Sequence, residues 1–137
     1  MASRIKISNP KGLAKPLGTY SHVARVKASE FLFIAGQVPV NAGGRLVGVD
    51  DFDAQARQVF RNLGAALKSA GAGYRNVVQF TTYLVNSRDI PKFRKFRERN
   101  YPKFFPDGKY PPNTLLIIDR LASEDILLEI AAIAALD

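Results

Sequence analysis

The chain has 137 residues, 47% of them hydrophobic, which is enough to bury a core within one domain over residues 1–137. It has no cysteine and one histidine, His22, so disulfides, thiolate nucleophiles and sulfur-bound zinc are excluded and no metal site is expected. The lack of cysteine fits the reducing cytoplasm. The net charge of +8 favours anionic partners. Its densest basic run, residues 88–103, is typical of the exposed face of a helix, with a nucleic-acid patch as the alternative.

The amino-terminal part predicts a leader followed by strands. Residues 1–15 are basic but lack the apolar segment of a signal peptide, and we expect them to be loosely ordered. Strands are predicted over residues 20–27 and 31–35, with a short one at 45–47.

The second of these strands ends in a glycine and a side-chain amide. Ala35, Gly36 and Gln37 are followed closely by Pro39. Because glycine has no Cβ atom, a second backbone or a ligand can come close to the strand at this point. The pattern indicates the edge of a polar pocket, but many buried strands end in the same way.

The first helix is predicted over residues 52–70. Asp50 and Asp51 are candidates for its amino-terminal cap, and Gly71 is the expected stop. Apolar residues at helical spacing form its inward face: Ala56, Val59, Phe60, Leu63, Leu67 and Ala70.

A strand over residues 77–85 leads into the second helix, which is expected to start at Ser87. Pro91 suits its first turn, and Pro102 should bend or end it near its last turn. The predicted inward residues of this helix are Ile90, Phe93, Phe96, Asn100 and Phe104.

Strands over residues 114–120 and 126–136 complete an α+β layer, in which both helices lie on one face of a sheet of four to six strands. The last strand is apolar on both faces, since its alternate residues are nearly all aliphatic. Two helices cover only one face, so we predict that another copy of the chain covers the second. The longest aliphatic run is too short to span a bilayer, and no membrane partner is expected.

Glu129 is the one carboxylate within this aliphatic strand. An unpaired buried carboxylate is costly, so Glu129 should lie at a pocket, beside water or beside a donor. A structural ion pair, for instance with Arg120, and a role as a catalytic acid or base both remain open.

Asn113 and Tyr20 are weaker candidates. Asn113 follows two prolines and opens a strand, where its amide could serve a ligand or only the turn. Tyr20 opens the first strand, where its phenol could meet a ligand or pack in the core.

Common catalytic and cofactor motifs are absent from the sequence. It contains no GxxxxGK[ST], GxGxxG, HExxH or GxSxG pattern, so no cofactor is expected. Ser21 and His22 are adjacent and point to opposite faces of a strand, which prevents them from acting as nucleophile and base.

Several motifs in order resemble the RidA family, also called YjgF or L-PSP endoribonuclease-like proteins. They are Gly18-Thr19-Tyr20-Ser21, IAGQVP, Gln55 and Asn62, AGAGYRNVVQFTTYL, the segment from Asn100-Tyr101 to Phe105, YPPNT and LEIAAIA. The resemblance covers nearly all of the chain from Pro16 to Ala134. It implies a chorismate-mutase-like α+β fold that assembles as a homotrimer, with clefts between subunits.

The resemblance also implies an activity, the hydrolysis of reactive enamines or imines to 2-keto acids and ammonia. Its active members hold the substrate carboxylate with an arginine. They add a tyrosine at the pocket mouth, backbone contacts at the Gly-Gln turn, and a glutamate that activates water. Tyr20, Gly36, Gln37 and Glu129 match by position.

Three positions depart from the active pattern. Asn113, before Thr114, stands where the active members carry the arginine; Ala35 replaces a serine; and Glu98 replaces a pocket asparagine. A neutral amide grips a carboxylate less well than a guanidinium does, so imines of amino acids are expected to be poor substrates and a neutral or cationic compound fits better.

Three functions follow as hypotheses. The first is a RidA-like hydrolytic deaminase of small imines or enamines with altered specificity, and the second is a non-catalytic homotrimer that binds a small ligand or a partner in the same clefts. The third, RNA cleavage or translation inhibition, is the least favoured, because one histidine does not supply the usual acid and base.

Overall fold

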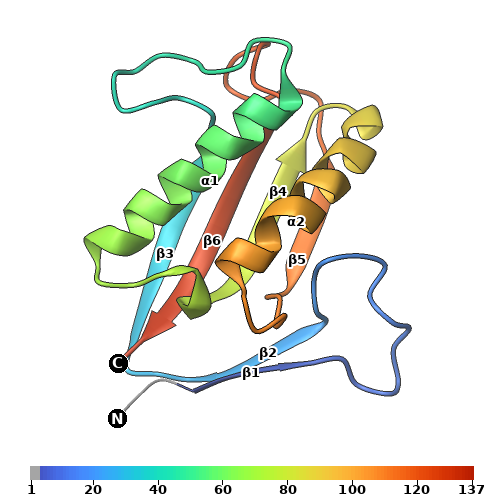
Figure 1. Ribbon diagram of the computed structural model, residues 1–137, viewed down its shortest axis with the longest axis vertical. Coiled ribbons are helices and arrows are strands. Elements are labelled where there is room, and N and C mark those ends of the chain that lie inside the picture. Colours follow the sequence, from blue (N-terminus) through green and yellow to red (C-terminus); the bar gives the residue numbers. More distant parts are fainter. Residues whose placement is uncertain (1–3) are drawn as a thin grey trace.

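Both helices lie on one face of a four-stranded sheet in the computed structural model, which describes residues 4–137 (Figure 1). β6 is central and antiparallel to both of its neighbours, while β4 and β5 are parallel. The predicted α+β layer with a mixed sheet is therefore confirmed. In spatial order the strands are β3 (Glu30–Gln37), β6 (Leu128–Leu136), β4 (Val77–Leu84) and β5 (Asn113–Ile117).

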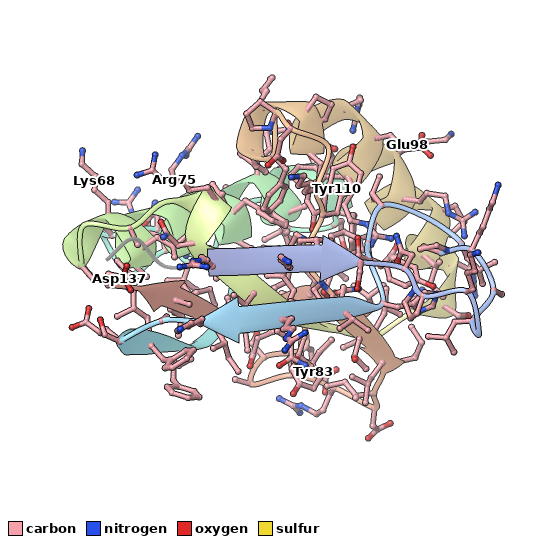
Figure 2. All side chains as sticks on the ribbon, turned by 90° about the horizontal axis from the view of Figure 1, so that it is seen from below. Lys68, Arg75, Tyr83, Glu98, Tyr110 and Asp137 are labelled. Atoms are coloured by element: carbon pink, nitrogen blue, oxygen red, sulfur yellow. The ribbon has the colours of Figure 1, made fainter. Side chains whose placement is uncertain are left out.

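A separate two-stranded ribbon is formed by β1 (Arg4–Ser8) and β2 (Val23–Lys27), seen in the foreground of Figure 2. The expectation of a loose leader is wrong for the residues of β1. The alternating apolar residues Ile5 and Ile7 lie opposite Val26 and Ala24 and share one side of the ribbon. The first three residues of the predicted leader lie outside the described part of the chain.

Three strand predictions need correction. The strand expected over residues 114–120 ends at Ile117. The strand expected from residue 20 begins only at Val23, because the preceding residues belong to the loop before it. The short strand expected at 45–47 does not form, and Val40 and Leu46 make an isolated bridge instead.

The first helix, α1 (Phe52–Ser69), agrees closely with its prediction. The Oδ1 atom of Asp51 accepts a hydrogen bond of 3.0 Å from the backbone N–H of Ala54, as a helix cap does. The chain leaves the helix through Gly71, whose φ of 73° suits glycine. The predicted inward stripe is buried except for Ala70, which is exposed because it lies beyond the last helical residue.

The second helix, α2 (Ile90–Phe104), follows a short 3₁₀ turn, η2 (Ser87–Asp89), and a similar turn, η1 (Tyr74–Asn76), precedes β4. α2 ends two residues after Pro102, as predicted. Ile90, Asn100 and Phe104, expected inward, are partly buried, and Ile90 and Phe104 pack against the core. The buried residues that the prediction missed are Arg97 and Tyr101.

The core lies between the helices and β6. Leu128, Ile130, Ala132 and Ala134 are buried beneath the helices, and Phe60 packs among aromatic side chains of β4 and α2. The opposite face of β6 is apolar too, and no element of the described chain covers it (Figure 1). This agrees with the prediction that β6 has two apolar faces and that the helices cover only one of them.

This uncovered face continues onto the neighbouring strands, and we call it the open face. Phe33 of β3 is 78% exposed there, and Leu116 of β5 is also exposed. Among residues 4–137, no helix has the length and hydropathy required to cross a membrane.

Candidate functional site

A β-bulge shapes the end of β3. Ile34 lies opposite Ala132 of β6 and Gln37 lies opposite Ile130, so Ala35 and Gly36 together face a single residue of β6. A bulge of this kind bends a strand and redirects its side chains. The Nε2 atom of Gln37 turns back and donates to the backbone carbonyl of Ala35 at 3.1 Å.

The side chain of Glu129 occupies the space that Gly36 leaves open. A Cβ atom on Gly36 would stand 2.0 Å from the Oε2 atom of Glu129, so the carboxylate lies directly against the glycine backbone. A second backbone or a ligand was predicted to come close at Gly36, and the group found there is a side chain of β6.

The proposed structural partner of Glu129 is engaged elsewhere. Arg120 forms its ion pair with Glu124, at 2.8 Å, so the ion pair suggested between Arg120 and Glu129 is wrong. Within residues 4–137 no ion pair of Glu129 is found, and its side chain is half-buried on the open face. The carboxylate is thus available to water or a ligand.

Two amides of α1 fix the loops around this bulge. The Nδ2 atom of Asn62 donates to the carbonyls of Val38 and Val40, at 2.9 Å each. Gln55 donates to the carbonyls of Gly48 and Asp125 and accepts from the N–H of Leu127, just before β6. Both residues belong to the motifs that the sequence singled out, and their observed contacts are structural.

A second group of candidate residues surrounds the start of β5. Ser21 forms an isolated bridge with Pro112, which brings Tyr20 close to Asn113. Asn113 begins β5, and its Oδ1 atom accepts a hydrogen bond of 2.8 Å from Oγ1 of the buried Thr82. The hydroxyl of Tyr20 accepts from the N–H of Leu17 at 3.3 Å.

The two groups do not meet within one chain. Glu129 pairs with Tyr83 of β4, whereas Asn113 pairs with Phe80, three residues away and on the other side of β4. Ordinary strand geometry puts these two positions about 14 Å apart. Asn113 also lies on the helix-covered face through its bond to Thr82, while Glu129 lies on the open face.

Two further predicted site residues are exposed. Thr114 follows Asn113 along β5 and therefore points to the open face. Glu98 lies on the solvent side of α2 and projects outward from the helix (Figure 2).

Arg97 is the polar residue that the sequence analysis missed. It is only 6% exposed, and its guanidinium stacks 4.4 Å from the centre of the Phe93 ring. Burial lowers the pKa of Arg97, and the nearby phenols of Tyr101 and Tyr20 partly oppose this shift. Arg97 lies four residues from both Phe93 and Tyr101, which places it on the same face of the helix. This spacing could have predicted from the sequence that Arg97 points inward.

No cluster of three or more metal-ligating His, Cys, Asp or Glu residues is found in the described part of the chain. The open face has a hollow of about 310 Å³ between β3, β6 and β4, with Phe33, Ala35 and Ile133 among its lining residues. Its lining is mostly apolar, which suits another protein surface better than a polar ligand.

Comparison with known proteins identifies the family. The sequence profile described as Endoribonuclease L-PSP matches residues 12–136, which is nearly the whole chain. The chain belongs to the Endoribonuclease L-PSP family. This confirms the resemblance on which the sequence analysis relied.

Individual members of the family are similar over almost their full length. A RutC family protein of Pyrococcus horikoshii is 37% identical, covering 88% of this chain and 89% of the relative. The 3-aminoacrylate deaminase RutC of Acinetobacter baylyi is 28% identical, covering 91% and 93%.

A solved structure of a Rid family protein of unknown function from Yersinia pestis has a TM-score of 0.84 and 33% identity. The match covers 98% of this chain and 99% of that protein. The likeness confirms the chorismate-mutase-like fold expected for the family.

Proposed function

We propose that the protein is a hydrolytic deaminase of small imines or enamines and that Glu129 is its catalytic acid and base. The observation that carries this proposal is the carboxylate of Glu129, which lies against Gly36 without an ion-pair partner in residues 4–137. Membership of the family and the name of the deaminase relative from Acinetobacter baylyi support it.

The chemistry needs one carboxylate and one water molecule. Glu129 accepts a proton as the oxygen of water bonds to the imine carbon and the π electrons move to nitrogen. The protonated carboxyl group then returns its proton to the nitrogen, which gives a carbinolamine. Glu129 next takes the proton of the new hydroxyl group as the carbonyl forms and passes it to the nitrogen, so that the C–N bond breaks and a carbonyl product and ammonia leave. An enamine first gains a proton on carbon and loses one from nitrogen to become the imine.

In this proposal the substrate specificity of the pocket differs from that of the active relatives. Asn113 offers a neutral amide, already bonded to Thr82 through its oxygen, where active relatives are expected to have an arginine. Ala35 supplies no hydroxyl beside Gly36. In this proposal Gly36 and Gln37 bind the substrate through the backbone of the bulge, and Tyr20, Asn113 and Thr114 contact it from the second group.

The proposal requires a homotrimer, because one chain keeps its two groups of site residues apart. The open face exposes Phe33 and Leu116, and a second copy seated on it would shelter these side chains. Glu129 of one copy would then share a cleft with Tyr20 and Asn113 of another. We place this trimer in the cytoplasm, as the absence of cysteine suggests.

RNA cleavage is less well supported. His22 is the only histidine in the sequence, and its Nε2 atom lies 2.7 Å from the carbonyl oxygen of Ala14, within the loop before β2. One histidine held in this way does not supply the separate acid and base that the reaction commonly uses.

The test is hydrolysis of a panel of imines generated in situ by oxidation of neutral amines and, for comparison, of amino acids. Glu129→Gln should lower the rate roughly 100-fold or more, because the amide takes up no proton. Glu124→Gln is the matched control, since Glu124 is an exposed carboxylate paired only with Arg120, and it should keep the wild-type rate. Equal rates for wild type and Glu129→Gln would contradict the proposal. Stabilisation by pyruvate without turnover would favour the non-catalytic binding trimer.

A further inference from the structure

A buried cation without a partner lies next to the second group of site residues. The Nε and Nη1 atoms of Arg97 are inaccessible to solvent and make no hydrogen bond within residues 4–137. A buried charge is costly unless it is paired, and arginine stays protonated in proteins. We therefore expect the guanidinium of Arg97 to pair with an anion from outside the chain.

The way in which Arg97 is held leaves its donors free. Its guanidinium lies over the Phe93 ring, a contact that uses the flat face of the group. The N–H donors point outward in the plane of the guanidinium, so the stacking consumes none of them. Phe93 thus fixes the group in one orientation, and because Nε and Nη1 are closed to solvent, Nη2 is the donor group left for an outside acceptor.

The guanidinium of Arg97 lies next to an exposed glycine, Gly18. The Nη2 atom of Arg97 lies 3.9 Å from the position that a Cβ atom on Gly18 would take, and nothing in the chain fills that position. Gly18 is exposed, so a small anion beside it comes within reach of the guanidinium. The next residue, Thr19, buries a hydroxyl that also has no partner within residues 4–137.

The same segment borders Asn113, the position that lacks an arginine. Tyr20 follows Thr19, and Ser21 bridges to Pro112, which precedes Asn113. Arg97 on α2 and Asn113 on β5 therefore flank residues 18–21 from two sides. A ligand held at Arg97 would lie beside the candidate pocket and would approach it from a different direction than one held at position 113.

We propose that Arg97 binds the carboxylate of a small substrate or ligand and so takes over the role of the arginine missing at position 113. The inference rests on the proposed function, and it replaces the neutral substrate expected from Asn113 with a small monocarboxylate. A carboxylate oxygen accepts a charge-assisted hydrogen bond from Nη2, the donor group beside Gly18. A phosphate dianion would need more positive charge than one buried cation provides.

Thermal unfolding of the full chain with unreactive probes tests this binding. Pyruvate should raise the melting temperature of the wild type by roughly 2 °C or more, while the uncharged pyruvamide and inorganic phosphate should have little effect. Arg97→Met should abolish the effect of pyruvate, and Arg97→Lys should weaken it at least tenfold in apparent affinity. Arg94→Met, an exposed cation on the same helix, is the control and should respond like the wild type.

Stability without ligand separates a binding role from a structural one. Replacing an unpaired buried cation with an apolar side chain of similar size should leave the melting temperature of Arg97→Met unchanged or higher. A large drop in the melting temperature, or dissociation of the oligomer, would show that Arg97 is paired structurally and would overturn the inference.

Two substitutions at Gly18 keep the guanidinium and change only the access to it. Gly18→Ala places one methyl group at ordinary contact distance and should keep the response to pyruvate. Gly18→Leu should cover the edge of Arg97 and remove that response. An unchanged pyruvate response in Gly18→Leu and in Arg97→Met would contradict the inference.

Steady-state kinetics test the role of Arg97 separately from the proposed hydrolysis. If the protein hydrolyses amino-acid imines, Arg97→Met should raise KM at least tenfold and change kcat by less than threefold, whereas Glu129→Gln should act on kcat. Turnover with an unchanged KM in Arg97→Met would refute the inference alone. Pyruvate binding that depends on Arg97 but occurs without turnover would refute only the proposed reaction.

Discussion

The two faces of the four-stranded sheet carry similar apolar side chains but differ in what covers them. On one face, Leu128 and Ile130 are buried under α1 and α2. On the other, Ala131 and Ile133 are only half-buried, and the neighbouring Phe33 is largely exposed. The chain completes its own core on the first face, and the second face needs another surface.

The charged residues of the candidate site are divided in the same way. Arg97 lies buried on the helix side of the sheet, and Glu129 lies half-buried on the open face. Neither has an ion-pair partner in the described part of the chain. Under the proposed function, one chain holds two incomplete parts of a site, and assembly would join them.

The largest effect on stability is expected on the covered face. Phe60 is 2% exposed and packs against Phe80, Phe96 and Tyr101, so Phe60→Ala leaves a cavity that the helices cannot close. We expect a loss of about 3–5 kcal/mol in the free energy of unfolding, measured by urea denaturation. Phe33→Ala should cost the isolated fold much less, since Phe33 is exposed. Similar losses for the two variants would contradict the division between the faces.

A smaller effect, on activity rather than folding, is expected at Gly36. In Gly36→Ala the new methyl group would collide with the carboxylate of Glu129, which must then move. We expect hydrolysis to fall roughly 10- to 100-fold, because a catalytic group loses its position. Gly12→Ala is the matched control, since a Cβ atom there meets nothing within 4 Å. Wild-type rates in Gly36→Ala would remove Glu129 from the mechanism.

The smallest expected effect is on the stability of the covered face, and it appears only at alkaline pH. Burial raises the pKa of Tyr101, and of Tyr74, above the ordinary value of 10. The stability that depends on neutral phenols is thus fully present below pH 10 and is lost as the pH rises above that value. Tyr101→Phe should reduce this alkaline loss by up to about 1.4 kcal/mol per pH unit, measured by urea denaturation between pH 9 and 11. An identical slope in wild type and variant would show that Tyr101 ionises freely.

Local rules predicted the parts of the fold that depend on short stretches of sequence. Asp51 caps α1 and Gly71 follows its end, as their residue types require. The alternation in β6 predicted two apolar faces of which the helices cover only one, and the structure has this arrangement. β1 was missed because a stretch of five residues with two isoleucines is too short to predict a strand by itself, and the strand forms by pairing with β2.

The candidate site was less accessible to sequence reasoning. Glu129 stood out because it interrupts an aliphatic strand. Gly36 was expected to admit a second backbone or a ligand, and its contact with the Glu129 side chain was not predicted. Arg97 was hidden in a basic run whose other members are exposed. Only its spacing from Phe93 and Tyr101 marks it as inward, and cations at such positions usually extend to solvent.

The mass of the protein in solution tests the central claim most directly. Light scattering of the eluted wild type should give about three times the chain mass of 15.1 kDa. Phe33→Glu, which places a charge on the open face at β3, should reduce the mass toward that of one chain while the far-ultraviolet circular dichroism is retained. A wild type that remains a stable monomer at high concentration would contradict the account, because its open face would then need no partner and the two parts of the site would stay apart.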